Sequence, residues 1–338
     1  MNQLLYQILK CIAKIIAPFY FSSIEINGLK NISKSGPIIF APNHQNAFLD
    51  AIVVAMVSPR PIYFLARASV FNSIFNRFLR AINMRPVYRI RDGYDSLSKN
   101  AKVFDECSKL LSEGKTLLLF PEADHGIEYY LRPLSRGLSR IAYQGQLATD
   151  SDVQILPVGI NYFDHVRSGS KLTLNFGEPL KVKEFITNDF PPGHIYNEIR
   201  TSLSLELKKV MVIPDKADNY GLKKSSLKDL EHLDFDKLRM TLGEDENIQK
   251  PNSPIKKYLR SIFYIPNAPF YLLVKAILKK KVKDPIFHAS IKYAFAMLAS
   301  PIWLGAIFLV IFKLYSLKVA ICVLFIQIVS ALLRVKLV

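Results

Sequence analysis

Short apolar runs and longer amphipathic stretches alternate along the middle of the chain. The runs are rich in β-branched and aromatic residues and predict strands at 37–41, 62–66, 86–89, 116–120, 153–158 and 172–176. Between them, apolar residues recur at helical spacing and predict helices at about 47–58, 69–82, 94–113, 134–148 and 195–211. Strands and helices in alternation predict an α/β fold with a mixed, largely parallel sheet flanked by helices.

The N-terminal stretch has the pattern of an amphipathic helix. One face collects the apolar side chains Leu4, Leu5, Ile8, Leu9, Ile12, Ile15 and Ile16. The opposite side carries Gln3, Gln7, Lys10 and Lys14, and Pro18 ends or kinks the helix. The apolar run is too short to cross a bilayer, and it lacks the basic head and cleavage site of a signal peptide. We expect an interfacial membrane helix, or else an ordinary amphipathic helix that covers a core.

The C-terminal region is far more apolar. Residues 293–312 carry no charge and are interrupted only by Pro301, and a second apolar run follows at 319–333. These runs predict a C-terminal transmembrane helical hairpin, with a buried helical pair as the alternative. An earlier patch at 262–278 contains two prolines and is more typical of an interfacial segment. Lysines that would stay in the cytoplasm over anionic lipid precede the hairpin, at Lys275, Lys279, Lys280, Lys281 and Lys283.

Charge and cysteine content narrow the possible partners. The 338 residues include 45 Lys plus Arg against 28 Asp plus Glu, a formal net charge of +17. A surface this basic attracts an anionic membrane or nucleic acid. No nucleic-acid recognition motif is present, and much of the basic excess flanks the apolar segments, which favours the membrane. Three widely separated cysteines without a CxxC motif argue against a disulfide scaffold and a zinc module.

A histidine and an aspartate follow the predicted strand at 37–41. The sequence from Pro42 reads PNHQNAFLD, which places His44 and Asp50 at a strand-to-helix junction. Sites in α/β sheets gather at the carboxyl ends of strands. A neutral imidazole there can take a proton from an alcohol, while a carboxylate behind it fixes the tautomer. His44 alone is more typical of a capping or core histidine, and the pairing with Asp50 makes an acid–base role equally plausible.

Further polar residues follow the other predicted strands. Glu122 ends the sequence FPE, directly after the strand at 116–120. Arginines lie in PVYRIR (Arg89 and Arg91) and in RPLSRG (Arg132 and Arg136), and Pro157 lies in ILPVG. Guanidinium groups in such loops bind phosphate, although each arginine taken alone is more typical of a solvated surface charge.

In this order and at this spacing, these blocks resemble the glycerol-phosphate/lysophospholipid acyltransferase family over about residues 25 to 210. The resemblance implies roles for single residues: catalysis by His44 with Asp50, binding of the acceptor phosphate by Arg89, help in holding the acceptor from Glu122, and shaping of the acyl-donor side by Pro157. It also implies transfer of a fatty acyl group from a thioester, on CoA or acyl carrier protein, to a hydroxyl. Neither a metal nor a bound cofactor is expected.

We add finer expectations to this assignment. Arg91 is the alternative to Arg89 for binding the acceptor phosphate, and Arg136 is a second candidate for binding an anion. Glu122 would contact either the glycerol hydroxyls of the acceptor or an arginine of its own loop. The oxyanion would be stabilised by donors that the sequence does not identify.

Two positions depart from the family pattern. Five residues separate His44 from Asp50, where four are usual, and the longer spacing resembles the branch that acylates glycerol 3-phosphate or dihydroxyacetone phosphate. Ala123 stands where the family has the glycine of FPEG. Either the backbone has an ordinary φ at Ala123, or the acceptor loop is altered.

The combined prediction is a membrane-bound O-acyltransferase of phospholipid biosynthesis. Its acceptor is glycerol 3-phosphate or 1-acyl-glycerol 3-phosphate, its partners are the acyl donor and an anionic membrane without nucleic acid, and its catalytic domain faces the cytoplasm. The expected parts are a membrane-associated helix (1–24), the catalytic domain (25–212), a polar linker or insertion (213–258) and a membrane region (259–338).

Alternatives to this function are an acyltransferase acting on another lipid acceptor, a membrane-bound lipid ester or thioester hydrolase, and a non-catalytic tether. The chain contains no G-x-S-x-G motif of the kind a hydrolase uses.

Overall fold

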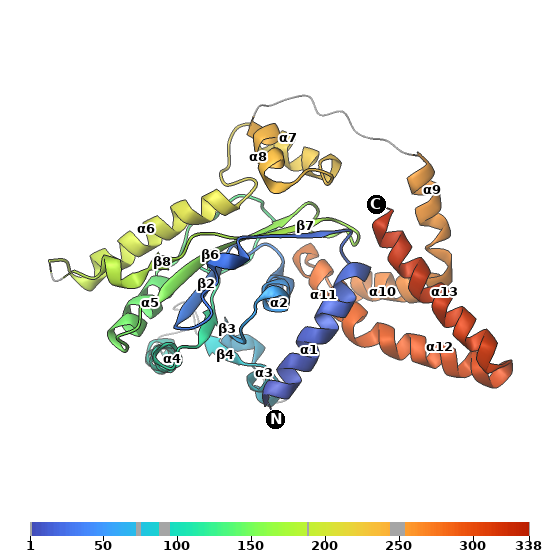
Figure 1. Ribbon diagram of the computed structural model, residues 1–338, viewed down its shortest axis with the longest axis horizontal. Helices are drawn as coiled ribbons and strands as arrows, with labels where there is room; N and C mark the ends of the chain where they lie inside the picture. The colour runs from blue at the N-terminus through green and yellow to red at the C-terminus, as the bar shows by residue number, and fades with distance from the viewer. Residues whose placement is uncertain (1, 72–75, 88–94, 188, 244–253, 338) are drawn as a thin grey trace.

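A computed structural model describes residues 2–71, 76–87, 95–187, 189–243 and 254–337 (Figure 1). Its centre is an eight-stranded sheet with the strand order β1-β7-β6-β2-β5-β3-β4, and β8 also pairs with β6. The strands are β1 (Ile24–Asn27), β2 (Ile38–Pro42), β3 (Ile62–Arg67), β4 (Met84–Val87), β5 (Thr116–Leu118), β6 (Gln154–Tyr162), β7 (Leu172–Phe176) and β8 (Leu180–Lys181). Among these pairs, β6 is antiparallel to β7 and to β8, and the others are parallel. The predicted mixed, largely parallel sheet is confirmed.

Helices flank this sheet, and further helices follow it in the chain. Within the α/β part they are α1 (Asn2–Ile16), α2 (Ala47–Val57), α3 (Asn76–Ala81), α4 (Asp95–Ser112), α5 (Gly137–Leu147) and α6 (Pro192–Val210). Beyond it they are α7 (Tyr220–Ser226), α8 (Phe235–Gly243), α9 (Pro254–Ile262), α10 (Ala268–Lys281), α11 (His288–Ala294), α12 (Ser300–Leu314) and α13 (Leu317–Lys336). The sequence pattern did not predict strands β1 and β8, which are short and lie outside its apolar runs.

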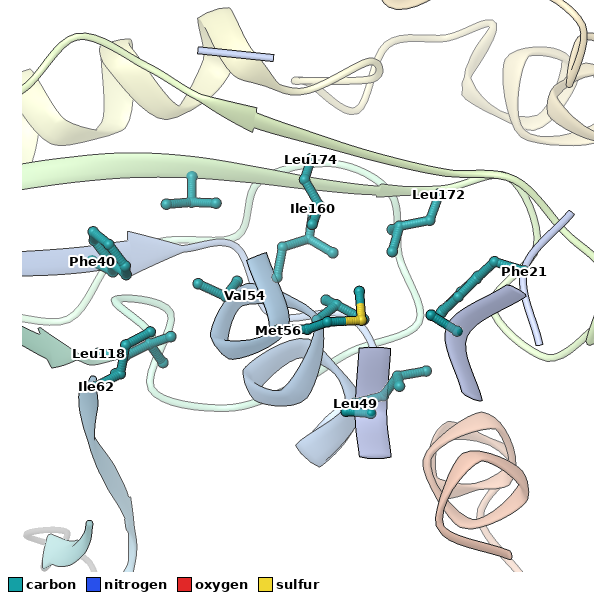
Figure 2. Close-up of a cluster of buried hydrophobic side chains, with 14 of the residues drawn as sticks. Phe21, Phe40, Leu49, Val54, Met56, Ile62, Leu118, Ile160, Leu172 and Leu174 are labelled. Atoms are coloured by element: carbon teal, nitrogen blue, oxygen red, sulfur yellow. The ribbon is translucent and has the colours of Figure 1, made fainter. Parts of the chain in front are cut away.

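Side chains of the central strands alternate between two cores, as the two-residue period of a strand requires. In β2, Ile38 and Phe40 point into a core with α1, α2 and α11, where Figure 2 shows Phe40 beside Leu118. The intervening Ile39 points into the opposite core, which α4, α5 and α6 cover. Both faces of the sheet are therefore buried, so the ends of its strands are the places left for a site.

The segment expected to be a polar linker or insertion folds in part into a small helical unit. Helices α7 and α8, with the 3₁₀ helix Leu227–Asp229 between them, bury Leu227, Leu230 and Leu238. These leucines pack against Phe163, which directly follows β6. The unit therefore covers the chain that leaves the carboxyl end of a central strand.

The C-terminal region carries long apolar helices on one side of the α/β core (Figure 1). Three helical segments, 258–281, 285–314 and 317–336, are long and apolar enough to cross a membrane by length and composition. The last two correspond to the predicted hairpin, and helices α12 and α13 pack on each other. The first includes the stretch at 262–278 that the sequence pattern suggests is interfacial.

Helix α1 packs against α2 along one edge and leaves apolar side chains on the other. Its buried edge carries Tyr6 and Ala13, whereas Leu4, Ile8 and Ile15 are exposed. The helix covers part of the core and still presents an apolar surface, so features of both interpretations of its sequence are present.

Candidate active site

The carboxyl ends of three neighbouring strands form the site. Strands β5 and β6 both pair in parallel with β2, so the three strands end at the same edge of the sheet. His44 follows β2, Glu122 follows β5, and Tyr162 is the last residue of β6. Residues far apart in the sequence therefore meet at one edge, as expected for an α/β sheet.

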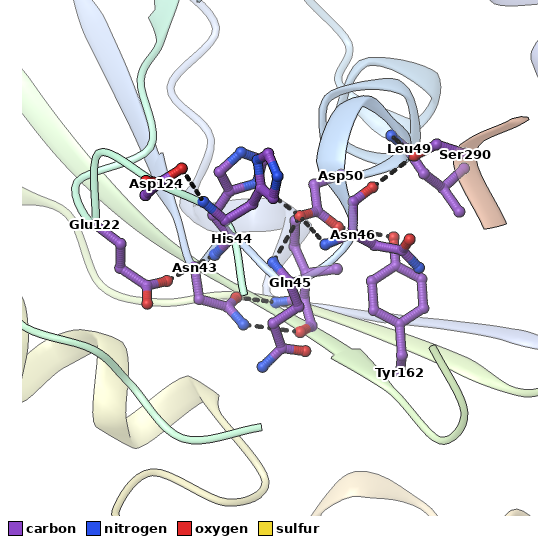
Figure 3. A network of polar contacts seen from close by, with 12 residues as sticks. Asn43, His44, Gln45, Asn46, Leu49, Asp50, Glu122, Asp124, Tyr162 and Ser290 are labelled. Atoms are coloured by element: carbon purple, nitrogen blue, oxygen red, sulfur yellow. Dashed lines mark hydrogen bonds and ion pairs between the residues drawn. The ribbon is translucent and has the colours of Figure 1, made fainter. Parts of the chain in front are cut away.

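His44 and Asp50 form the central pair of this site (Figure 3). His44 Nδ1 lies 2.8 Å from Asp50 Oδ2, so the imidazole donates this hydrogen bond when the carboxylate is ionised. Asp50 is fully buried in the first turn of α2. The His44 side chain is 13% exposed, and among the described residues its Nε2 makes no hydrogen bond. The five-residue spacing therefore still brings the two side chains together.

Three further donors hold the Asp50 carboxylate. The backbone N–H groups of Gln45 and Asn46 donate to Oδ2 at 2.8 Å each, and the Tyr162 hydroxyl donates to Oδ1 at 2.9 Å. Burial, together with the neighbouring Asp50 charge, raises the pKa of Tyr162 well above its usual value, so the phenol keeps its proton. Asp50 is fixed on both of its oxygens, which leaves His44 little freedom to turn away.

The backbone reaches this arrangement through a left-handed residue. Ala47, the first residue of α2, has a φ of +45°. This region costs a residue with a Cβ about 1–2 kcal/mol. Ala47 lies inside the five-residue interval between His44 and Asp50, next to the two N–H groups that point at the carboxylate.

Glu122 and Arg132 hold the backbone of His44. Glu122 Oε1 accepts the His44 N–H at 2.7 Å, and its Oε2 accepts from Arg132 Nε at 2.7 Å and from the Arg132 N–H at 3.1 Å. Arg132 in turn donates to the His44 carbonyl at 3.1 Å. Burial raises the pKa of Glu122, while the Arg132 charge and the N–H donors oppose this shift. Of the two partners expected for Glu122, this structure provides the arginine of its own loop.

Ala123 has a φ of +60°, so the backbone at this position does not have the ordinary φ that was one of the two alternatives. The backbone adopts the left-handed conformation that favours glycine, yet alanine occupies it. Its N–H donates to the Phe120 carbonyl at 3.1 Å, which closes a tight turn around Glu122. The loop keeps the left-handed geometry and carries the strain of a Cβ there.

Aromatic rings surround the His44 imidazole. Phe120 stacks on it with ring centroids 3.7 Å apart, and His125 approaches its edge at 5.4 Å. Burial and the neighbouring His44 lower the pKa of His125, which favours its neutral form. One face of the His44 ring is therefore covered by Phe120, and His125 lies at its edge.

A second layer of polar residues supports the turn after His44. Gln45 donates to the Tyr129 carbonyl at 3.1 Å, and its Oε1 lies 3.0 Å from His165 Nε2. The Asn46 side chain donates to the His165 carbonyl at 3.0 Å. Burial lowers the pKa of His165 to about 4, so His165 is neutral near pH 7 and can donate to Gln45.

The remaining predicted site residues lie elsewhere or outside the description. Arg89 and Arg91 fall within 88–94, which is outside the described residues. Arg136 is exposed at the start of α5, and Pro157 is buried in β6 opposite Ala41 of β2. Within the described part of the chain, no group of three His, Cys, Asp or Glu side chains is placed to hold a metal ion.

Two residues in direct contact with the pair were not among those expected in the site. Tyr162 contacts Asp50 because β6 lies beside β2, a neighbourhood that a single sequence does not reveal. His125 is the third residue after FPE and could have been considered from its position alone. Arg132 belongs to a quoted block, but its contact with Glu122 depends on the fold of the loop between them.

Part of the chain matches the model of a known protein family. Residues 23–161 match the model of the acyltransferase family, described simply as acyltransferase. These residues form an acyltransferase-family domain. The matched range contains His44, Asp50, Glu122 and Pro157, and it ends one residue before Tyr162. The matched range thus includes the ends of β2 and β5 and all of β6 except Tyr162, and it includes nothing from the C-terminal helices.

Two individual proteins are similar to parts of this chain. An uncharacterized acyltransferase of Schizosaccharomyces pombe is 33% identical over 81 residues, which are 24% of this chain and 12% of the relative. The chain thus spans about an eighth of the length of this curated relative. A crystal structure of the 1-acyl-sn-glycerophosphate acyltransferase PlsC from Thermotoga maritima matches with a TM-score of 0.43 and 18% identity, covering 60% of this chain and 80% of that one.

Proposed function

We propose that this protein is a membrane-associated O-acyltransferase that transfers a fatty acyl group from a thioester to the hydroxyl of a phosphoglycerol lipid precursor. The observation that carries the proposal is the 2.8 Å contact between His44 and a buried Asp50 within an acyltransferase-family domain. The donor is acyl-CoA or acyl carrier protein. The acceptor is glycerol 3-phosphate or 1-acyl-glycerol 3-phosphate.

In the proposed mechanism His44 is the general base. With Nδ1–H donated to Asp50, the unprotonated Nε2 removes the proton of the acceptor hydroxyl as its oxygen attacks the thioester carbonyl. The tetrahedral intermediate then collapses, the carbon–sulfur bond breaks, and the departing thiolate takes the proton back from Nε2. An ester and a free thiol result, and no acyl-enzyme forms.

The surrounding residues keep His44 in position for this step. Asp50 selects the tautomer and stabilises the imidazolium that forms. Glu122 and Arg132 hold the His44 backbone through hydrogen bonds of 2.7 and 3.1 Å. Arg89 would neutralise the acceptor phosphate. Arg91 is the alternative residue for this role, and Arg136 is a further candidate.

The apolar and basic surfaces favour a lipid substrate at a membrane. Apolar side chains on α12 and α13 are exposed, among them Ile302, Leu309 and Phe325. Exposed lysines end α10 and continue to Lys283, which suits an anionic cytoplasmic leaflet. We therefore place the catalytic domain on the cytoplasmic face.

The proposal is tested with purified full-length protein in detergent and radiolabelled acyl-CoA or acyl carrier protein. Wild type, His44→Ala and His194→Ala each receive glycerol 3-phosphate, 1-acyl-glycerol 3-phosphate or no acceptor. His194 is a half-exposed residue of α6 and serves as the matched control. We expect acceptor-dependent ester formation that His44→Ala abolishes and His194→Ala preserves.

Other outcomes would redirect the assignment. Fatty acid released without an acceptor, and lost in His44→Ala, would indicate a thioester hydrolase. Transfer only to a different lipid hydroxyl would keep the reaction class and replace the acceptor. Activity that survives in His44→Ala would overturn the proposed mechanism.

A further inference from the structure

A serine from the C-terminal region contacts the turn that carries Asp50. Ser290 of α11 accepts the Leu49 N–H at 3.0 Å and donates to the Asn46 carbonyl at 2.7 Å (Figure 3). Ser290 and Leu49 are both fully buried, although 241 residues separate them in the chain. One hydroxyl therefore bridges both ends of the turn at 46–49.

The Ser290 hydroxyl acts as a cap for the N-terminus of α2. The first N–H groups of an α-helix have no acceptor within the helix, and a side chain before the helix usually supplies one. Asn46 precedes α2 but makes no capping bond, because its side chain donates to the His165 carbonyl instead. The Leu49 N–H also donates to the Asn46 carbonyl at 3.1 Å, and Ser290 supplies a second acceptor for it from a distant element.

The position of Ser290 is fixed by the packing of its own helix. Tyr293, one turn further along α11, is fully buried and donates to the Ala13 carbonyl at 2.7 Å. Tyr20 donates to the carbonyl of Ala289 at 3.2 Å. The short helix is therefore anchored to the N-terminal segment on both sides of Ser290, and it packs against α2.

The same segment also reaches the imidazole side of the site. Phe287, just before α11, meets the edge of His125 with ring centroids 5.2 Å apart. His125 in turn meets His44 at 5.4 Å. Residues 287–290 therefore contact the surroundings of both members of the His44–Asp50 pair.

We infer that Ser290 is a positioning residue for the proposed acyl transfer: it holds the turn at 46–49 so that Asp50 stays against His44. This inference rests on the proposed function of His44. It extends the site beyond the acyltransferase domain at 23–161. Because 285–314 is one continuous helical segment, the chain that enters the apolar region also completes the catalytic turn.

The test compares Ser290→Ala with Ser300→Ala in full-length protein. Ser300 lies in the same helical segment, but its hydroxyl donates to Ala296 within the helix. The first measurement is hydrogen–deuterium exchange of peptides that cover 45–57. The second is kcat and KM for acyl transfer, because a displacement of about 1 Å in a catalytic group lowers rates roughly a hundredfold.

We expect Ser290→Ala to speed exchange at 46–49 and to lower kcat roughly ten- to a hundredfold with KM nearly unchanged. Ser300→Ala should change neither quantity. Faster exchange with an unchanged kcat would overturn the inference, as would equal effects of both substitutions or unchanged exchange. If wild type proves to have no transferase activity, the proposed function fails, while the exchange data still show whether Ser290 holds the turn.

Discussion

The Glu122 carboxylate accepts the backbone N–H of His44 at 2.7 Å, so these two residues are joined before any substrate is bound. The other Glu122 oxygen is occupied by Arg132, which also donates to the His44 carbonyl. Glu122 therefore fixes the chain that presents the imidazole. Glu122 therefore contributes by positioning His44, because both of its oxygens already have partners, His44 on Oε1 and Arg132 on Oε2.

Glu122→Gln separates this interpretation from direct binding of the acceptor. The amide would place a donor against those of Arg132 and deprive this partly buried guanidinium of its carboxylate partner. Breaking a fully buried ion pair costs about 3–5 kcal/mol, and this is the upper bound for the substitution. We expect a clear fall in the apparent melting temperature together with a lower kcat. Glu106→Gln, which removes the more exposed Arg85 pair, is the control and should cost at most about 1 kcal/mol. Unchanged stability with only a raised acceptor KM would show that Glu122 binds substrate.

Ala123→Gly should stabilise the protein. The left-handed φ of +60° costs alanine about 1–2 kcal/mol, and glycine removes that strain while losing part of the gain through its freer unfolded chain. We expect a net gain of up to about 1 kcal/mol in unfolding free energy, measured by thermal denaturation. Ala101→Gly at an exposed position in α4 should instead destabilise by about 1 kcal/mol. A loss of stability in Ala123→Gly would contradict the strained geometry.

Tyr162→Phe should slow the reaction without removing any proposed catalytic group. The substitution deletes the 2.9 Å hydrogen bond to Asp50 Oδ1, and a hydrogen bond to a charged group is worth about 1.5–3 kcal/mol. We expect kcat/KM to fall roughly tenfold or more in steady-state assays. Tyr143→Phe is the control, because its hydroxyl makes no hydrogen bond among the described residues. Equal kcat/KM values in the two variants would argue against support of Asp50 by Tyr162.

His165 should make stability depend on pH. Burial lowers its pKa from 6.5 to about 4, so below pH 6.5 the unfolded chain takes up a proton that the folded chain does not. The unfolding free energy should therefore fall as pH decreases from 6.5 to 4, by about 3 kcal/mol in total. His165→Gln keeps a donor for Gln45 and should show a smaller loss of melting temperature between pH 7.5 and 5. Identical losses in wild type and variant would contradict a buried neutral His165.

Local features of this protein were predictable from its sequence, and long-range ones were not. The buried strands are continuous apolar runs, and His44 and Asp50 are six residues apart, so one turn of chain can join them. Tyr162 reaches Asp50 only because β6 lies next to β2, which the strand pattern leaves open. The contact of Ser290 spans more than two hundred residues and involves a common, uncharged side chain that no spacing rule singles out.

The most direct test of the account is the single-turnover rate of acyl transfer in wild type, His44→Gln and Asp50→Asn. If His44 is the general base and Asp50 sets its tautomer, both variants should lose roughly a thousandfold or more while remaining folded. An acyl-transfer rate in His44→Gln within about a factor of two of wild type would contradict the central claim, because general-base catalysis contributes roughly a hundred- to ten-thousandfold.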